Sequence, residues 1–296
     1  MMPHGQNQEL QHSSGDRSRK LLNKLFQDPM GVVGLLIVTS FLIIAIFADV
    51  IAPYDPSKID ILNKLQGPSA DHLFGTDQLG RDTLSRLIYG TQIALMVAGV
   101  SIGLAVLIGS VLGAIAGYGP NWLDFVIMLL FDMVRSYPVI MFALAVVVLF
   151  GPSLVTIMAI IVATSFPTYG RLMRTQTQSM RQAEYILSAR ALGIGMPRIL
   201  LRHVLPNTIG PILIVASMDV PFVIALEAGL SFLGLGVRPP TPSWGSILND
   251  GYTYIRNSKW ILISAGIPLI LVTIGFTFLG EQLRDIFDPK IDRGSQ

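Results

Sequence analysis

Long stretches without charge constrain this chain more than any other feature. No Lys, Arg, Asp or Glu occurs in residues 29–48, 87–123, 136–170 or 260–280. A helix needs roughly 20 residues, at 1.5 Å each, to cross a hydrocarbon core of about 30 Å. Of the 296 residues, 51% are hydrophobic and 14% are charged, whereas soluble domains carry about 25% charged residues. The sequence therefore predicts an all-α polytopic membrane protein.

The apolar runs predict six transmembrane helices. We place them at about 31–51, 92–117, a third that is broken at Pro138 and ends near Phe150, 153–169, 208–235 and 260–280. The first run follows a long polar tail and lacks a small-residue cleavage site, so we expect it to stay as a membrane helix rather than act as a signal peptide. Basic residues at 17, 19, 20 and 24 place that tail in the cytoplasm. Six crossings then return the C-terminus to the cytoplasm.

The second expected helix carries a row of glycines. Gly99, Gly103, Gly109, Gly113 and Gly117 repeat a small-xxx-small spacing. Small residues at this spacing let helix backbones approach closely in a membrane. We expect this row to form a helix–helix contact.

An arginine-rich segment interrupts the apolar pattern. Residues 171–206 hold six arginines and one acid, Glu184. Arginine excess is typical of cytoplasmic loops, and simple positive-inside anchoring is one interpretation. We also expect two short helices here, at 183–192 and 198–205, with Gly193 at a helix C-terminus and Pro197 in a first turn. Arginines at 198 and 202 share one helical face and repel, which indicates an acidic partner, either a lipid headgroup or a protein.

Two further segments are expected on the opposite side. Asp77, Arg81, Asp82 and Arg86 indicate a short, capped, salt-bridged helix at the membrane interface. Residues 237–258 contain Pro239, Pro240, Pro242 and Trp244, a pattern typical of a rigid aromatic cap. Both segments are also compatible with solvated loops with anchoring aromatics, and we favour structural roles over solute contact. Asp71, His72 and Asp77 are a possible metal cluster, although local capping is the favoured interpretation.

Acidic residues within the apolar pattern have two interpretations. Asp219 and Glu227 fall in the fifth expected helix. A carboxylate at mid-bilayer costs about 2.5–3.5 kcal/mol on insertion scales, so it usually faces a bundle interior or an aqueous path. From the sequence, these two acids can either line a translocation path or form structural hydrogen bonds, and neither interpretation is favoured. Asp132 and Arg135 are expected to form an intrahelical ion pair.

Several kinds of chemistry have no support in the sequence. The net charge of +2 does not indicate nucleic acid, and the absence of Cys excludes disulfides and thiolate metal sites. No P-loop motif occurs, so the chain should not bind ATP by that route. The sequence also lacks H-E-x-x-H and a G-x-S-x-G elbow. We expect no catalytic residue, cofactor or metal on this chain.

Several motifs together resemble one transporter family. In chain order they are IAPYDP, HLFGTDQLGRDTLSRLIYG, EYILSARALG, RHVLPN, EAGLSFLGLGVRPPTPSWG and LGEQLRDIFDPK. They are similar to the C-type permease of the dipeptide, oligopeptide and nickel ABC importers, over nearly residues 20–290. The arginine-rich segment resembles the family's EAA-type cytoplasmic motif. Leu187 stands where that motif has Glu, and Glu184 lies one turn earlier.

The resemblance implies a type I ABC importer permease fold and a set of partners. These are a homologous second permease, two ABC ATPase subunits that use ATP and Mg, an extracytoplasmic solute-binding protein and membrane lipid. The segment around Gly193 would be the coupling helix. The implied ATPase-coupling residues are Glu184, Ser188, Ala189, Arg190, Gly193, Pro197, Arg198, Leu205 and Pro206. The candidates for the translocation path or its gate are Asp219, Glu227 and Phe232.

The expected organisation follows from the spans and the resemblance. It comprises a cytoplasmic tail (1–28), a first helix (29–52), an extracytoplasmic segment (53–90), a core permease domain with five helices (91–280) and a cytoplasmic tail (281–296). The core includes the coupling loop (171–206) and an extracytoplasmic loop (237–258). We expect a bacterial inner-membrane importer of di- or oligopeptides. Nickel complexes or another small solute are the alternative cargo, and an ion-coupled secondary transporter or an intramembrane enzyme is the alternative class.

Overall fold

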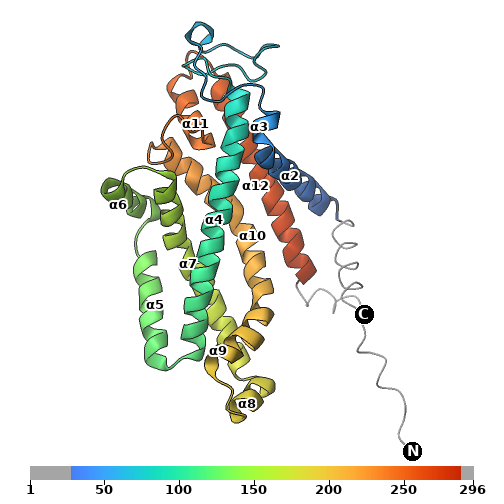
Figure 1. Ribbon diagram of the computed structural model, residues 1–296, viewed down its shortest axis with the longest axis vertical. Helices are drawn as coiled ribbons and strands as arrows, with labels where there is room; N and C mark the ends of the chain where they lie inside the picture. Colours follow the sequence, from blue (N-terminus) through green and yellow to red (C-terminus); the bar gives the residue numbers. More distant parts are fainter. Residues whose placement is uncertain (1–27, 288–296) are drawn as a thin grey trace, which may run out of the picture.

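The computed structural model describes residues 28–287, and the regular elements in that range are helices (Figure 1). The long ones are α2 (Pro29–Ile46), α4 (Thr83–Tyr118), α7 (Leu154–Arg181), α10 (Leu205–Phe232) and α12 (Trp260–Phe287). The shorter ones are α3 (Ala48–Ile51), η1 (Ile61–Asn63), α5 (Asn121–Arg135), α6 (Val139–Phe150), α8 (Glu184–Ala191), α9 (Met196–Ile199), the π-helical η2 (Leu200–Val204) and α11 (Trp244–Thr253). The basic N-terminal tail and the last residues of the C-terminal tail lie outside the described range.

Membrane-spanning helices match the predicted fold class. Within residues 28–287, five helices are long and apolar enough to cross a membrane, and the pair α5–α6, bent by 87°, makes up to six. The break falls at Ser136–Pro138, as Pro138 predicted, because a proline disfavours helical backbone in the residue before it. Three helices run beyond the predicted spans: α4 begins at Thr83 rather than near 92, α7 continues to Arg181 rather than ending at 169, and α12 continues to Phe287 rather than 280.

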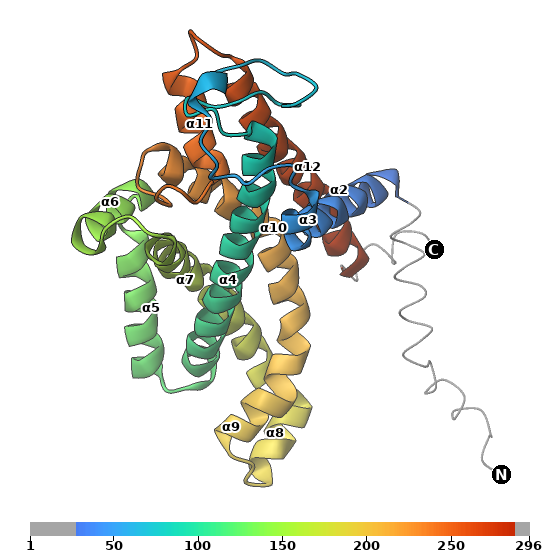
Figure 2. The same cartoon turned by 45° about the horizontal axis from the view of Figure 1, so that its top comes forward.

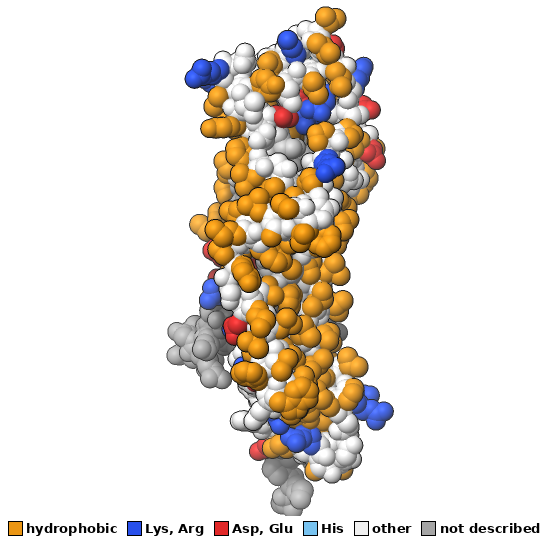
Figure 3. All heavy atoms as spheres, turned by 90° about the vertical axis from the view of Figure 1, so that its left-hand side faces the viewer, with side chains coloured by type: hydrophobic (Ala, Val, Ile, Leu, Met, Phe, Trp, Pro, Cys, Tyr) orange, Lys and Arg blue, Asp and Glu red, His pale blue; other side chains and the backbone are white. Residues whose placement is uncertain are grey.

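Helices α8 and α9 project from one end of the molecule, and α11 lies at the other (Figures 1 and 2). We call these the α8 end and the α11 end. On the face shown in Figure 3, hydrophobic side chains cover the middle, and most charged side chains gather towards the two ends. This distribution suits a bilayer around the middle of the molecule.

Part of the predicted glycine row holds α4 against α7. A Cβ added to Gly109 would overlap the carbonyl oxygen of Phe166, and one added to Gly113 would overlap that of Gly170. A Cβ on Gly117 would lie 2.7 Å from the carbonyl oxygen of Arg174. Around Gly99 and Gly103, by contrast, a Cβ would meet nothing within 4 Å. Only the second half of the row therefore forms the close contact within this chain.

A buried ion-pair network builds the α11 end. Asp77 accepts from Arg81 Nε at 2.6 Å and also pairs with Arg86, whose Nη1 lies 3.2 Å from Asp250 of α11. Arg81 and Arg86 are almost fully buried. Asp82 caps α4 by accepting from the Ser85 amide at 2.7 Å. The predicted capping and salt bridges are present, but the expected short interfacial helix was wrong, because these residues lead into the 36-residue α4.

Trp244 ties the predicted aromatic cap to the membrane helices. Its side chain is fully buried, its Nε1 donates to the Leu87 carbonyl at 3.1 Å, and its ring meets the Phe41 ring edge-on at 5.9 Å. The cap therefore packs as part of the core. His72 pairs with Asp82 at 2.9 Å, while Asp77 binds arginines. His72 and Asp77 thus bind different partners and do not form the possible metal cluster. Within residues 28–287 there is no group of three His, Asp or Glu residues able to hold a metal.

Candidate coupling and translocation site

Helix α8 is a short amphipathic helix that ends in the predicted turn. Ile186 and Ala189 face inward, while Glu184, in its first turn, and Ser188 are exposed. Gly193 has φ +77°, and the Ile194 amide donates to the Ala189 carbonyl at 3.1 Å. This 6→1 hydrogen bond with a left-handed glycine is a Schellman motif. A Cβ on Gly193 would meet nothing within 4 Å, so its backbone angle, rather than crowding, requires glycine.

The second predicted short helix, at 198–205, is not a separate element. Pro197 lies in the first turn of α9, as predicted, but α9, η2 and α10 run together as one helical span, Met196–Phe232. Leu205 and Pro206 are therefore inside this span. Pro206 cannot donate a hydrogen bond to the preceding turn. The adjoining residues adopt π-helical geometry, a local adjustment by which membrane helices tolerate proline.

Arginines near α8 have two kinds of surroundings. Those at 181 and 190 lie over the Tyr118 ring, with their Cζ atoms 5.7 and 6.0 Å from its centroid. The cation–π contact of Arg190 holds α8 against the end of α4, and that of Arg181 holds the end of α7 there. Arg198 and Arg202 are exposed and form no ion pair with another described residue. These two cations stay available to a partner.

Large apolar side chains surround the same turn, and the sequence motifs had drawn attention only to Leu187 among them. At the α8 end, Tyr185, Leu187, Leu192 and Leu201 are between 48% and 80% exposed. Exposed apolar groups beside free cations are typical of a protein contact rather than of a solvated loop. Three of them, Tyr185, Leu187 and Leu192, lie in EYILSARAL among polar and charged residues, and this pattern was the available signal.

The arginines that begin the predicted coupling loop belong to α7 instead. Arg171 pairs with Asp132, and Arg174 binds both carboxylate oxygens of Asp124, at 2.5 and 2.6 Å. These two residues therefore extend α7 as a helix, and α5 supplies the acids that pair with their side chains. The expected pair between Asp132 and Arg135 was wrong, since Arg135 donates to the Thr168 hydroxyl at 3.1 Å.

Asp219 lies in a polar cavity between the broken helix and α10. The cavity has a volume of about 230 Å³, and its polar lining comprises Arg135, Tyr137, Thr164, Ser165, Thr168 and Asp219. Tyr169 donates to Asp219 at 2.8 Å. Asp219 lies about 21 Å along α10 from Leu205, well inside this helix. A second polar hollow, lined by Asp132, Arg135, Ser136 and Arg171, adjoins it through Arg135.

Glu227 is packed rather than exposed to this cavity. Its side chain is fully buried, Ser231 donates to its Oε1 at 2.7 Å, and its Oε2 has no hydrogen-bond partner among the described residues. Phe232 meets the Tyr252 ring edge-on at 5.9 Å, and its carbonyl accepts from Asn249 at 2.7 Å. The structure thus separates the candidate path residues: Asp219 lines the polar cavity, Glu227 is buried, and Phe232 lines a different, largely apolar pocket between α10 and α12.

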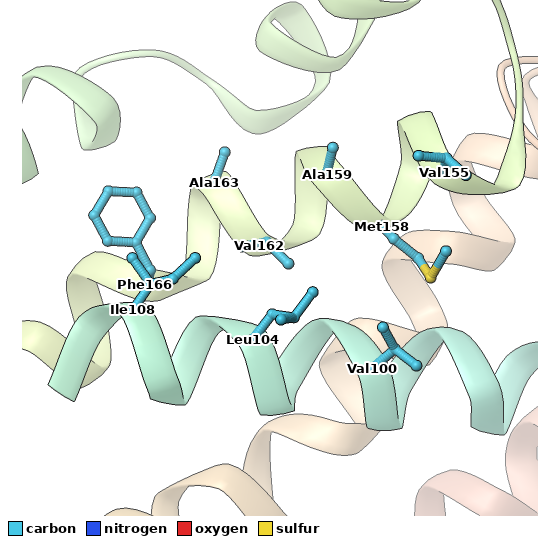
Figure 4. Close-up of a pocket in the computed structure, with 9 residues that line it drawn as sticks. All are labelled: Val100, Leu104, Ile108, Val155, Met158, Ala159, Val162, Ala163 and Phe166. Atoms are coloured by element: carbon cyan, nitrogen blue, oxygen red, sulfur yellow. The ribbon is translucent and has the colours of Figure 1, made fainter. Parts of the chain in front are cut away.

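A larger groove lies between α4 and α7 and is almost wholly apolar (Figure 4). Its volume is about 480 Å³. Its lining residues are Val100, Leu104 and Ile108 of α4 with Val155, Met158, Ala159, Val162, Ala163 and Phe166 of α7. It offers no charged or hydrogen-bonding side chain to a hydrophilic solute, unlike the Asp219 cavity.

Residues 109–293 match the family model described as the inner-membrane component of binding-protein-dependent transport systems. The chain belongs to this permease family. Residues 18–68 of the permease also match the N-terminal transmembrane domain of oligopeptide transport permease C. These matches confirm the predicted family and its C-type subgroup.

Curated relatives cover nearly the whole permease. It is 38% identical to a dipeptide transport system permease of Alkalihalophilus pseudofirmus, over 96% of this chain and 93% of the relative. It is 37% identical to a di/tripeptide transport system permease of Pseudomonas aeruginosa, over 87% of each chain. A glutathione transport system permease of Pectobacterium atrosepticum is 35% identical, over 92% of this chain and 91% of that one.

A solved structure supports the fold. An inward-facing MetNI methionine ABC transporter matches with a TM-score of 0.56 at 17% identity, covering 69% of this chain and 97% of that chain. The permease is therefore an inner-membrane, multi-span subunit of an ABC importer and not itself an enzyme. Importers of this family work with an ATPase and a solute-binding protein.

Proposed function

We propose that this permease forms half of the translocation path for di- or oligopeptides. The observation that carries the proposal is the cavity that holds both Asp219 and Arg135. A peptide has an ammonium group at one end and a carboxylate at the other, so a site with one carboxylate and one guanidinium offers a partner to each. Relatives named for dipeptides, di/tripeptides and glutathione support this cargo. A nickel complex stays the alternative prediction.

The proposed complex contains this chain, a homologous second permease, two ABC ATPases and an extracytoplasmic solute-binding protein. ATP and Mg would be used by the ATPases, and this chain would bind no cofactor. The basic and apolar surface around Gly193 supports an ATPase contact at the α8 end, through the residues predicted for coupling. ATP-driven closure of the ATPases would then move α8 and bias the permease pair between inward-open and outward-open states.

The peptide proposal predicts different results for the two acids. Asp219→Asn should lower uptake of a free-amino dipeptide about tenfold or more per assembled complex, because it removes a charge-assisted contact worth about 1.5–3 kcal/mol. Uptake of the N-acetylated dipeptide should change little. Glu227→Gln is the matched control, since that residue does not line the cavity, and its uptake per assembled complex should stay normal. Radiolabelled uptake in proteoliposomes measures both. Equal behaviour of the two variants would contradict the assignment of Asp219.

We also propose that the α8 end is cytoplasmic and the α11 end extracytoplasmic. The chain contains no Cys, so in a single-cysteine variant only the introduced residue can be labelled. Thr241 and Ser188 are exposed at the two ends, whereas Ser243 is buried as the N-cap of α11. A membrane-impermeant maleimide added to spheroplasts should label Thr241→Cys and should label Ser188→Cys only after lysis. The opposite pattern would overturn the orientation.

A further inference from the structure

A cavity at the α11 end lies outside the proposed translocation site. It has a volume of about 440 Å³ and lies where α12 begins. One side comes from Leu65 and Gly67, and the other comes from Arg256, Ser258, Lys259 and Trp260. The mechanism of transport proposed above uses none of these residues.

The polar part of this cavity is suited to an anion. Arg256 and Lys259 are exposed, form no ion pair with another described residue, and share the cavity with no Asp or Glu. They flank the N-terminus of the 28-residue α12. The first amide groups of a helix lack intrahelical acceptors, and the helix dipole favours negative charge there.

Ser258 adds an independent sign of a missing ligand. Its side chain lines the cavity and is only 5% exposed, yet its hydroxyl has no hydrogen-bond partner among the described residues. Leaving a buried hydroxyl without a hydrogen-bond partner destabilises the fold. An anion bound between Arg256 and Lys259 would supply an acceptor for this hydroxyl.

The position of the cavity identifies the anion's source. The charge-free run of α12 begins at Trp260, next to Lys259, so the cavity lies at the boundary between headgroups and hydrocarbon. Trp260 and Ile263 line it and are 48% and 50% exposed. They give an acyl chain an apolar surface in the same cavity as the basic residues. A free phosphate would use only the polar half of this site.

We propose that this cavity binds the phosphodiester headgroup of an anionic phospholipid, with the acyl chains lying along the start of α12. Arg256 and Lys259 neutralise the phosphate, while the Ser258 hydroxyl and the first amides of α12 donate hydrogen bonds to it. The bound lipid holds the segment after η1 against α12, because it contacts both.

Lipid binding to the assembled transporter tests this proposal. Native mass spectrometry would count phosphatidylglycerol bound to the wild type and to Arg256→Gln/Lys259→Gln, with phosphatidylcholine as the neutral lipid. Each Lys or Arg near an anionic membrane surface raises the affinity about fivefold. Losing two should therefore weaken phosphatidylglycerol binding about thirtyfold. Lys58→Gln/Arg238→Gln is the matched control, since it removes two exposed cations outside the cavity. Its phosphatidylglycerol binding should equal that of the wild type.

A milder variant covers the case in which the double variant does not assemble. Ser258→Ala keeps both charges and should still weaken phosphatidylglycerol binding severalfold. Equal binding in all variants would overturn the proposal. So would inorganic phosphate competing fully with the lipid, which would indicate a free-anion site. Normal lipid binding with weakened docking of the solute-binding protein would show that the cations serve a protein contact instead.

Discussion

Gly113→Ala should strongly destabilise the folded permease, although it adds a single methyl group. The added Cβ would overlap the carbonyl oxygen of Gly170, a backbone atom of α7. A side chain could rotate away, but here one of two packed helices must shift. Overpacking typically costs about 1–3 kcal/mol and occasionally more, and a backbone obstacle places this site at the upper end. The yield of monodisperse protein after detergent extraction and its thermal midpoint should both fall.

Gly103→Ala is the matched control on the same helix. A Cβ there meets nothing within 4 Å, and alanine is about 1 kcal/mol better than glycine in a helix. This variant should fold as well as the wild type or better. If the two alanine variants have equal thermal midpoints, the contact between α4 and α7 is not as close as the structure has it.

Gly193→Val should abolish ATP-driven uptake while the permease still inserts and assembles. At φ +77° a residue with a Cβ is strained by about 1–2 kcal/mol, and a β-branched residue is tolerated worst. No neighbouring atom lies within 4 Å of that Cβ, so the strain acts only on the turn between α8 and α9. The turn should open and misplace Leu192 and Arg198. Uptake and substrate-stimulated ATP hydrolysis in proteoliposomes measure the loss.

Gly193→Asn separates backbone strain from side-chain bulk. Asparagine tolerates the left-handed region and is nearly as large as valine. Its uptake should stay close to that of the wild type. Loss of uptake in both variants would show that a partner surface excludes any side chain at this position, and normal uptake in both would remove the turn from the coupling pathway.

Local sequence patterns predicted the membrane helices and the turn at Gly193, because both depend on neighbouring residues. They failed where distant residues meet. Arg171 and Arg174 seemed to belong to the loop after the fourth span, yet they lie on α7, where Asp132 and Asp124 of α5 pair with them. Arg86 and Asp250, 164 positions apart, could likewise not be paired from spacing.

The two acids of α10 show the same limit at the candidate site. In the sequence, Asp219 and Glu227 are both carboxylates within one apolar run, and neither interpretation could be preferred for either. Packing distinguishes them, because Tyr169 and the broken helix surround Asp219 with polar groups, whereas Ser231 and α11 enclose Glu227. Tertiary contacts from other helices supplied that information.

The single helical span from Met196 to Phe232 mechanically connects the two ends of the permease. Its 37 residues extend about 55 Å, from the turn at Gly193 to the contact between α10 and α11. A tilt of about 5° at the α8 end would carry the far end through about 5 Å, a displacement comparable to one helical turn. Pro211 and Pro221 each remove a backbone hydrogen bond within this span. The displacement transmitted to the α11 end therefore depends on how stiff the helix is at these two prolines.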